Sequence, residues 1–317
     1  MSGWKWLGQA PATAARRAAL RALLGPLPSF DISDADAPHS ELVEVQTLPH
    51  ARLEVWKLAL NAEESVPAWL LLPLHQPPRG LVLYNHAHGN RFDTGKNELL
   101  NGRPALQNPP YGVALPEMGW AVLAIDHWCF GERATSSERA TVKRLLWEGR
   151  TLWGYRLHDT LAAFDWLRTQ PRFAQVPTVT LGLSMGSTMA VWAAALEPRI
   201  DACIDLCCLA EYDALLARGS HDLHGEYFFV PGLRREFSAA EIAALIAPRR
   251  HLSLVGRHDP LTPPAGVQSV DDALRSAYAT LDHPDEWEQV VVDAGHQETP
   301  AMRERVLQTL RQLERQH

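Results

Sequence analysis

The sequence is poor in several features that mark whole classes of protein. Only four of its 317 residues are cysteines, and none of them forms a C-x-x-C pair or an evenly spaced framework. A disulfide scaffold is therefore disfavoured, and buried reduced thiols are expected. These cysteines are Cys129, Cys203, Cys207 and Cys208.

Charge and hydrophobic runs exclude further classes. The 30 basic and 37 acidic side chains give a formal net charge of -7, which disfavours nucleic acid and anionic membranes as partners. No segment offers about 18 uninterrupted apolar residues, so no membrane-spanning helix is predicted. The N-terminus lacks an apolar secretion signal with a small-residue cleavage site, and we therefore predict a cytoplasmic protein.

No Gly/Ser-rich linker or internal repeat divides the chain. The hydrophobic share of 46% is enough for a large core. We therefore predict a single domain over residues 1–317. The sequence leaves open whether a second copy of the chain binds as a homodimer partner.

The first part of the chain predicts a helix followed by strands. Ala and Leu at helical spacing predict a helix over 10–24, within an N-terminal extension covering 1–40. Segments rich in Val, Leu and Trp at 41–47, 52–60 and 67–73 predict three strands. Successive strands of this kind indicate an antiparallel edge of a sheet.

From Gly80 onward, short apolar runs alternate with longer helical patterns, which is typical of βαβ units. This rhythm predicts an α/β fold with a mostly parallel, doubly wound sheet. The predicted parallel strands are 81–85, 121–126, 178–183, 202–207, 252–256 and 289–292. The predicted helices are 137–169, 185–196, 238–247, 265–281 and 299–315.

One stretch, 209–237, is too long for an ordinary βα loop. We predict that it is a lid-like insert that forms a wall of a pocket. Tyr227 and Phe228 in this insert, with the nearby Trp128, are candidates to line an apolar substrate pocket. Packing in the core is the alternative for these aromatic side chains.

The chemistry begins at Gly182-Leu183-Ser184-Met185-Gly186, a G-x-S-x-G motif between the predicted strand 178–183 and the predicted helix 185–196. The motif requires this context, because a strained turn from strand to helix presents the serine hydroxyl. A side chain on either glycine would collide with neighbouring elements. Ser184 is therefore the candidate nucleophile, and a simple helix cap is the alternative.

A serine nucleophile needs a base and an acid, which in this kind of fold follow in the order Ser, Asp or Glu, His. Asp259 follows the predicted strand 252–256, and His296 follows the predicted strand 289–292. Both lie where ligand sites collect in open sheets. The competitors, which we rank lower, are Asp285, Asp293 and His258.

In the predicted mechanism, His296 takes the Ser184 proton and Asp259 holds the imidazole in the required tautomer. The oxyanion needs backbone donors. The Met185 amide is one, and the other should come from the loop after strand 81–85. There we predict the His88 amide, with the alternatives Ala87 and Asn90.

Histidines in this loop allow a competing interpretation. His86 and His88, with a carboxylate such as Asp126, could form a metal site, but H-x-H without a fixed third ligand is a loose pattern. We predict no metal and no other cofactor.

With these residues, the chain resembles the α/β-hydrolase superfamily, within it the dienelactone hydrolase and acetyl xylan esterase-like branch. The likeness covers roughly residues 70 to 315. It includes Ser184, Asp259 and His296 as the triad. Ala87 departs from a commoner Gly, and Ser184 stands where a dienelactone hydrolase has Cys. The other matching segments are 86–90, 95–99, 124–126, 130–133, 227–233 and 247–250.

The resemblance implies a serine carboxylesterase, with a small-molecule ester of acetyl type, free or linked to carbohydrate, as substrate. The alternatives are an aminopeptidase- or oligopeptidase-like hydrolase, for which Glu226 is a candidate anchor, and an inactive hydrolase fold that serves as a binding module.

Overall fold

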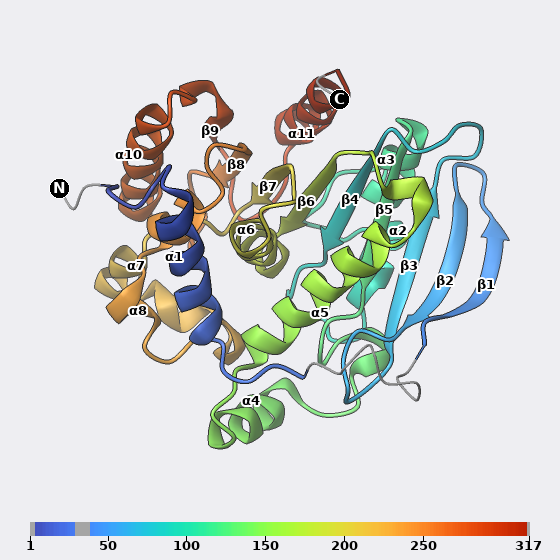
Figure 1. The fold of residues 1–317 in the computed structure, drawn as a ribbon, viewed down its shortest axis with the longest axis horizontal. Helices are drawn as coiled ribbons and strands as arrows, with labels where there is room; N and C mark the ends of the chain where they lie inside the picture. The colour runs from blue at the N-terminus through green and yellow to red at the C-terminus, as the bar shows by residue number, and fades with distance from the viewer. Residues whose placement is uncertain (1–3, 29–38, 316–317) are drawn as a thin grey trace.

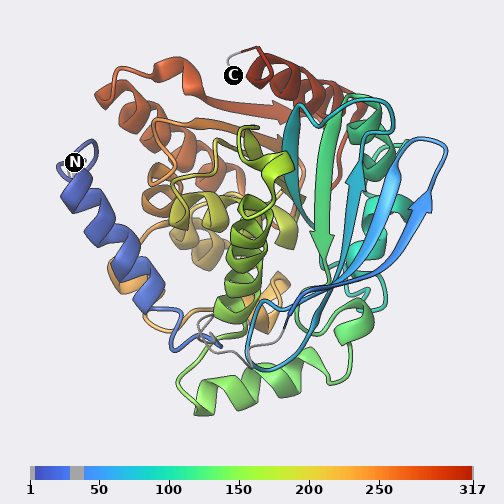
Figure 2. The same cartoon turned by 45° about the vertical axis from the view of Figure 1, so that its right-hand side comes forward.

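The computed structural model describes residues 4–28 and 39–315. Within these residues, one nine-stranded sheet carries helices on both faces (Figures 1 and 2). The strand order is β1-β2-β3-β5-β4-β6-β7-β8-β9. The strands are β1 (Glu41–Thr47), β2 (Arg52–Leu58), β3 (Val66–Leu72), β4 (Gly80–Asn85), β5 (Trp120–Ile125), β6 (Thr178–Leu183), β7 (Ala202–Leu206), β8 (Arg250–Gly256) and β9 (Trp287–Val292).

The strand directions match the prediction of an antiparallel edge followed by a parallel sheet. The pairs β1–β2, β2–β3 and β3–β5 are antiparallel, whereas all pairs from β5 to β9 in the sheet order are parallel. The predicted α/β fold with an antiparallel edge is confirmed. Because parallel strands end at the same edge of the sheet, the loops after β4, β6, β7, β8 and β9 gather there.

The two faces of the sheet bury two separate clusters of apolar side chains. Along β4, Leu81 and Leu83 belong to one cluster, and Val82 and Tyr84 belong to the other, as the two-residue period of a strand requires. The first cluster includes side chains of α1 (Ala10–Ala22), α5 (Leu152–Arg168), α6 (Met185–Leu196), α9 (Ala239–Ala244) and α10 (Pro264–Thr280). The second includes those of α2 (Glu98–Asn101), α3 (Tyr111–Glu117) and α11 (Pro300–Leu313).

One helix prediction is wrong in extent. The segment 137–169 forms two helices, α4 (Glu138–Trp147) and α5, instead of one. The chain turns between them at Gly149, which has a positive φ, and the Thr151 side chain caps α5 by accepting a hydrogen bond from the Gly154 amide. The glycine in the left-handed region ends α4, and the threonine hydroxyl that caps the next helix begins α5.

The insert 209–237 is folded. It contains α7 (Tyr212–Arg218), α8 (Leu233–Glu236) and the short 3₁₀ turns Ser220–Leu223 and Glu226–Phe228. Its role as a lid stays a prediction.

In the N-terminal extension, α1 matches the predicted helix, and residues 1–3 and 29–38 lie outside the described residues.

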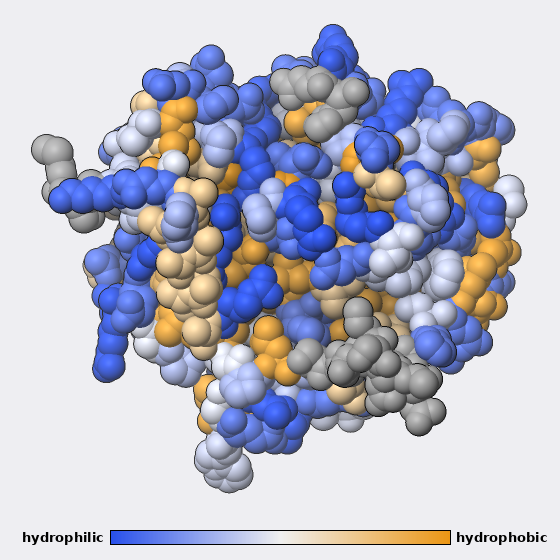
Figure 3. All heavy atoms as spheres, in the orientation of Figure 1, coloured by the Kyte–Doolittle hydropathy of each residue, from blue (hydrophilic) through white to orange (hydrophobic). Residues whose placement is uncertain are grey.

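The edge strand β1 exposes side chains on both faces. Leu42, Val43 and Val45 are exposed, and apolar atoms are visible over β1 at the right-hand edge of Figure 3. The β1–β2 register shifts between Leu42 and Glu44, and such an irregularity hinders pairing with another edge. The homodimer stays a prediction.

In the described part of the chain, no helix combines the length and apolarity that crossing a membrane requires.

Candidate active site

The predicted strained turn is present at Ser184. Strand β6 is buried along its whole length and runs directly into Ser184, and α6 begins at the next residue. Ser184 has φ 60° and ψ -119°, a backbone conformation that non-glycine residues rarely adopt, and that costs on the order of 1–3 kcal/mol. Its amide donates to the carbonyl oxygen of Leu206 at 2.8 Å, which ties the turn to the end of β7. The Ser184 side chain remains partly exposed.

Both glycines of the motif are required by close backbone contacts. A Cβ atom on Gly186 would overlap the carbonyl oxygen of Asn85 at the end of β4. A Cβ atom on Gly182 would overlap the backbone of Gly186. The turn therefore depends on the absence of side chains at both positions, as the sequence predicts.

Asp259 and His296 form the predicted pair. The His296 Nδ1–H donates to Asp259 Oδ2 at 2.7 Å, and Asp259 Oδ1 accepts from the Leu261 amide at 2.9 Å. The Asp259 side chain is fully buried, whereas that of His296 is 26% exposed. A buried carboxylate with a second hydrogen-bond donor holds the imidazole in one orientation and leaves Nε2 free to act as a base.

The competing residues lie elsewhere. His258 pairs with Asp293 at 2.6 Å, and both side chains are largely exposed. Asp285 offers its backbone oxygen to Arg250. The ranking made from sequence therefore agrees with the geometry, and the catalytic roles of Ser184, Asp259 and His296 stay predictions.

Adjacent strand ends bring Ser184 toward this pair. Ser184 is bonded to the end of β7, where Cys207 follows, and the Cys207 amide donates to Leu254 of β8 at 2.9 Å. The Cys207 Sγ and one side-chain ligand atom each of Asp259 and His296 lie within 4.8 Å of one another. Among the described residues no hydrogen bond joins the Ser184 hydroxyl to His296, and such bonds often shorten only when substrate binds.

The sequence identifies Cys207 only as a buried thiol and gives no sign that it lies near Asp259. Burial, together with the charge of Asp259, raises the pKa of Cys207 to about 12. The side chain is thus a neutral thiol near neutral pH and a poor nucleophile. By distance alone Cys207, Asp259 and His296 could hold a metal ion, but Asp259 and His296 are hydrogen-bonded to each other at 2.7 Å.

The oxyanion loop follows β4, and two of its three candidate amides are occupied. The Ala87 amide donates to both carboxylate oxygens of buried Glu98, at 3.1 and 3.2 Å. The Asn90 amide donates to His88 Nδ1 at 3.1 Å. Among the described residues, no hydrogen bond uses the amide of His88 or that of Met185 at the start of α6. The alternatives Ala87 and Asn90 are therefore disfavoured, and His88 with Met185 stays the predicted pair of donors.

The three residues of the competing metal hypothesis have different partners. His86 Nε2 accepts from the His127 amide at 3.3 Å, and burial lowers the pKa of His86 to about 3, so that the ring is neutral. His88 Nε2 contacts Glu138 at 3.0 Å. Asp126 accepts from Lys96 Nζ at 2.8 Å. Their ligand atoms are thus directed into three separate interactions.

Two of the three predicted pocket residues are core residues. Trp128 is buried, its ring packs edge to face on Tyr155, and the Arg133 guanidinium covers it at 4.5 Å. Tyr227 is also buried and stacks on His88, with ring centroids 4.8 Å apart. For Trp128 and Tyr227 the structure therefore supports core packing, because neighbouring side chains already cover both rings.

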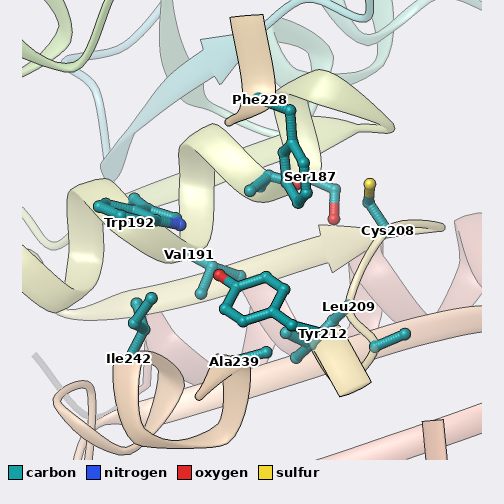
Figure 4. Close-up of a pocket in the computed structure, with 11 residues that line it drawn as sticks. Ser187, Val191, Trp192, Cys208, Leu209, Tyr212, Phe228, Ala239 and Ile242 are labelled. Carbon is teal, nitrogen blue, oxygen red and sulfur yellow. The ribbon is translucent and has the colours of Figure 1, made fainter. Parts of the chain in front are cut away.

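Phe228 does line a cavity, shown in Figure 4. The cavity lies against α6, the helix that begins directly after Ser184, and its volume is about 20 Å³. In Figure 4 the rings of Phe228 and Tyr212 both point into it. The other lining residues are Ser187, Thr188, Val191, Trp192, Cys208, Leu209, Ala210, Ala239 and Ile242. Those of α6 lie three, four, seven and eight positions after Ser184, a helical spacing that could have identified them.

The insert also contacts the loop that carries Asp259. His224 Nε2 contacts the carbonyl oxygen of Leu261 at 3.3 Å, two residues after Asp259, and its ring stacks on Phe228 at 4.8 Å. Burial lowers the pKa of His224, and the nearby His296 acts in the same direction. Segment 209–237 therefore contacts both the oxyanion loop, through Tyr227, and the loop that carries Asp259.

Comparison with known proteins places the chain in a family. No family model matches it. It is 38% identical over 298 residues to a protein of Bacillus subtilis (strain 168) named "Putative hydrolase YtaP", with 94% of this chain and 98% of that protein covered. The chain belongs to the α/β-hydrolase superfamily. This α/β-hydrolase is an enzyme, as the sequence predicts.

Solved structures of low sequence identity share the fold of the hydrolase. A "putative acetyl xylan esterase" from Bacteroides fragilis NCTC 9343 matches with a TM-score of 0.73 at 16% identity, covering 98% of this chain and 91% of that chain. A glucuronoyl esterase from Solibacter usitatus gives 0.65 at 14%, covering 97% and 94%. Acetyl Xylan Esterase 1 from Thermoanaerobacterium sp. JW/SL YS485 gives 0.59 at 18%, covering 95% and 93%.

Proposed function

We propose that the hydrolase is a serine carboxylesterase that works through an acyl-enzyme. The observation that carries the proposal is the Asp259–His296 hydrogen bond at the sheet edge where the strained turn holds Ser184. Ser184 attacks the ester carbonyl while His296 takes its proton, and the Met185 and His88 amides stabilise the oxyanion. His296 then protonates the leaving alcohol and activates the water that releases the acid.

We further propose that the acyl group is short, as in acetyl-type esters that are free or linked to carbohydrate. The cavity along α6, the helix that begins directly after Ser184, has a volume of about 20 Å³, which accommodates roughly one water-sized group. The esterase structures that share the fold include proteins named for acetyl xylan. Glu226, the candidate anchor for a peptide amino group, forms an exposed ion pair with Arg139 at 3.3 Å, which gives the peptidase alternative no support.

Relative rates on a matched ester and amide test this proposal. We expect p-nitrophenyl acetate to be cleaved with a kcat/KM at least roughly 10³ times that of p-nitroacetanilide, because expelling an amine requires more assistance and the candidate anchor Glu226 is paired with Arg139. Chelator should leave the ester rate unchanged. Comparable rates on both substrates would favour the peptidase alternative, and no turnover by folded protein would favour the binding module.

The Phe228 side chain should limit acyl length. Phe228 and Tyr212 line both the small cavity and a neighbouring groove of about 310 Å³, so Phe228→Ala should join the two spaces. The ratio of kcat/KM for p-nitrophenyl octanoate to that for the acetate should rise by about 10-fold or more, given the binding energy of extra methylenes. Leu223, an exposed apolar residue of the same insert that lines neither space, is the control, and Leu223→Ala should leave the ratio unchanged. An unchanged ratio in a stable Phe228→Ala protein would refute the assignment.

A further inference from the structure

Arg156 in the middle of α5 is a fully buried cation that the proposed mechanism does not use. Its Nη2 donates to the carbonyl oxygen of Trp128 at 2.8 Å and to Glu138 Oε2 at 2.6 Å. Its Nη1 contacts the sulfur of Met185 at 3.3 Å. A buried charge is costly unless it is paired and hydrogen-bonded, so this cluster of contacts requires an explanation.

Glu138, the first residue of α4, is the partner of Arg156 and is itself buried. Burial acts to raise its pKa, but the hydrogen bond from His88 and the charge of Arg156 hold the pKa of Glu138 below its usual value. The carboxylate is therefore ionised near neutral pH and accepts from two donors, Arg156 and His88.

The hydrogen bonds fix the tautomer of His88. Its Nδ1 accepts from the Asn90 amide at 3.1 Å, so in the neutral ring the proton is on Nε2. Nε2 then donates to Glu138 at 3.0 and 3.1 Å. Tyr227 of the insert stacks on the His88 ring and lies under the Arg156 guanidinium at 4.8 Å, which excludes water from one side of these bonds.

These contacts join the two residues whose amides are proposed as oxyanion donors. Met185 starts α6 and His88 belongs to the loop after β4, and the path between their side chains runs through Arg156 and Glu138. Oxyanion donors act only when both reach the developing charge at about 2.7–3.1 Å. A rigid link between the two donors sets that spacing before substrate binds.

We propose that Arg156 and Glu138 are positioning residues that hold the His88 and Met185 amides at the separation required by the transition state. The inference rests on the proposed function, because it assumes that these amides form the oxyanion hole. It predicts that disrupting the link weakens binding of the transition state more than binding of the substrate.

The test compares Glu138→Gln with Glu54→Gln. Glu54 is also a buried carboxylate bonded to an arginine, Arg172, at 2.7 and 2.9 Å, and it lies in β2 away from the sheet edge that carries Ser184. Glu138→Gln should lower kcat on p-nitrophenyl acetate by about 10- to 100-fold with KM changed by less than about 3-fold. Glu54→Gln should lower thermal stability and leave kcat unchanged.

A double variant separates positioning from stability. Replacing Glu138 alone leaves Arg156 buried and unpaired, so Glu138→Gln combined with Arg156→Met should regain Tm while kcat stays low. The inhibition constant of a phenylboronic acid, which mimics the tetrahedral state at a serine, should rise in proportion to the loss of kcat/KM in each variant. Recovery of kcat together with Tm, or an unchanged kcat in Glu138→Gln, would overturn the inference.

Failure of this inference is distinct from failure of the proposed function. If Ser184→Ala retains activity, the serine mechanism itself is wrong. If activity depends on Ser184 and Glu138→Gln keeps the wild-type kcat, only the positioning role is wrong.

Discussion

The Ser184→Ala variant is expected to lose ester hydrolysis, with kcat/KM for p-nitrophenyl acetate lower by on the order of 10³-fold or more. The methyl group cannot form the acyl-enzyme, while the Asp259–His296 pair and the backbone amides remain in place. The loss should fall on kcat, since binding of the small ester does not depend on the hydroxyl.

A buried serine away from the proposed acyl cavity is the control for this prediction. Ser253 of β8 is fully buried, and its hydroxyl donates to Asp205 Oδ1 at 3.1 Å. Ser253→Ala should retain kcat within about 3-fold, because its hydrogen bond contributes only to stability, by about 1 kcal/mol. Ser184→Ala with more than a tenth of wild-type activity, measured on protein with an unchanged Tm, would show that another residue is the nucleophile.

The second large effect is expected at Gly186. In Gly186→Ala the new Cβ would overlap the carbonyl oxygen of Asn85, and neither backbone segment can move without disturbing β4, β6 or the start of α6. We expect a loss of about 3 kcal/mol or more of folding free energy. Activity should be lost in the protein that remains folded, because Ser184 and the Met185 amide would both shift.

Gly149 supplies the matched comparison. It has a positive φ, but no atom lies within 4 Å of the position that a Cβ would take there. Gly149→Ala should therefore cost only the strain of its backbone conformation, about 1 kcal/mol, and leave kcat unchanged. Thermal unfolding followed by circular dichroism measures both variants. Equal Tm values for the two variants would contradict the steric account of the motif.

The parts of this structure that follow a local pattern were predictable. Strand β4 buries every residue and alternates between two core clusters, and apolar runs of this kind mark a parallel sheet covered on both faces. Asp259 and His296 could be paired in advance because each follows a strand of that sheet. The motif around Ser184 identified the candidate nucleophile together with its strained turn.

Interactions between distant segments were not predictable in the same way. Trp128 follows β5 and Tyr227 lies in the insert 209–237, and the sequence of neither segment shows that its aromatic ring is covered. Only the packing of Tyr155 and His88 against these rings shows it. The sequence did not indicate that Arg156 is buried, because a charged residue in a helix is ordinarily exposed. The burial of Arg156 depends on its partner Glu138, which starts α4. The predicted single helix 137–169 leaves out the turn between α4 and α5 that brings the two residues together.

The central claim, that Ser184 is an activated nucleophile, is tested most directly by covalent labelling with a fluorophosphonate and peptide mass spectrometry. The account predicts one label per chain, on Ser184, formed by wild type and absent from Ser184→Ala. A folded, esterase-active protein that takes no label, or takes it on a residue other than Ser184, would contradict the account.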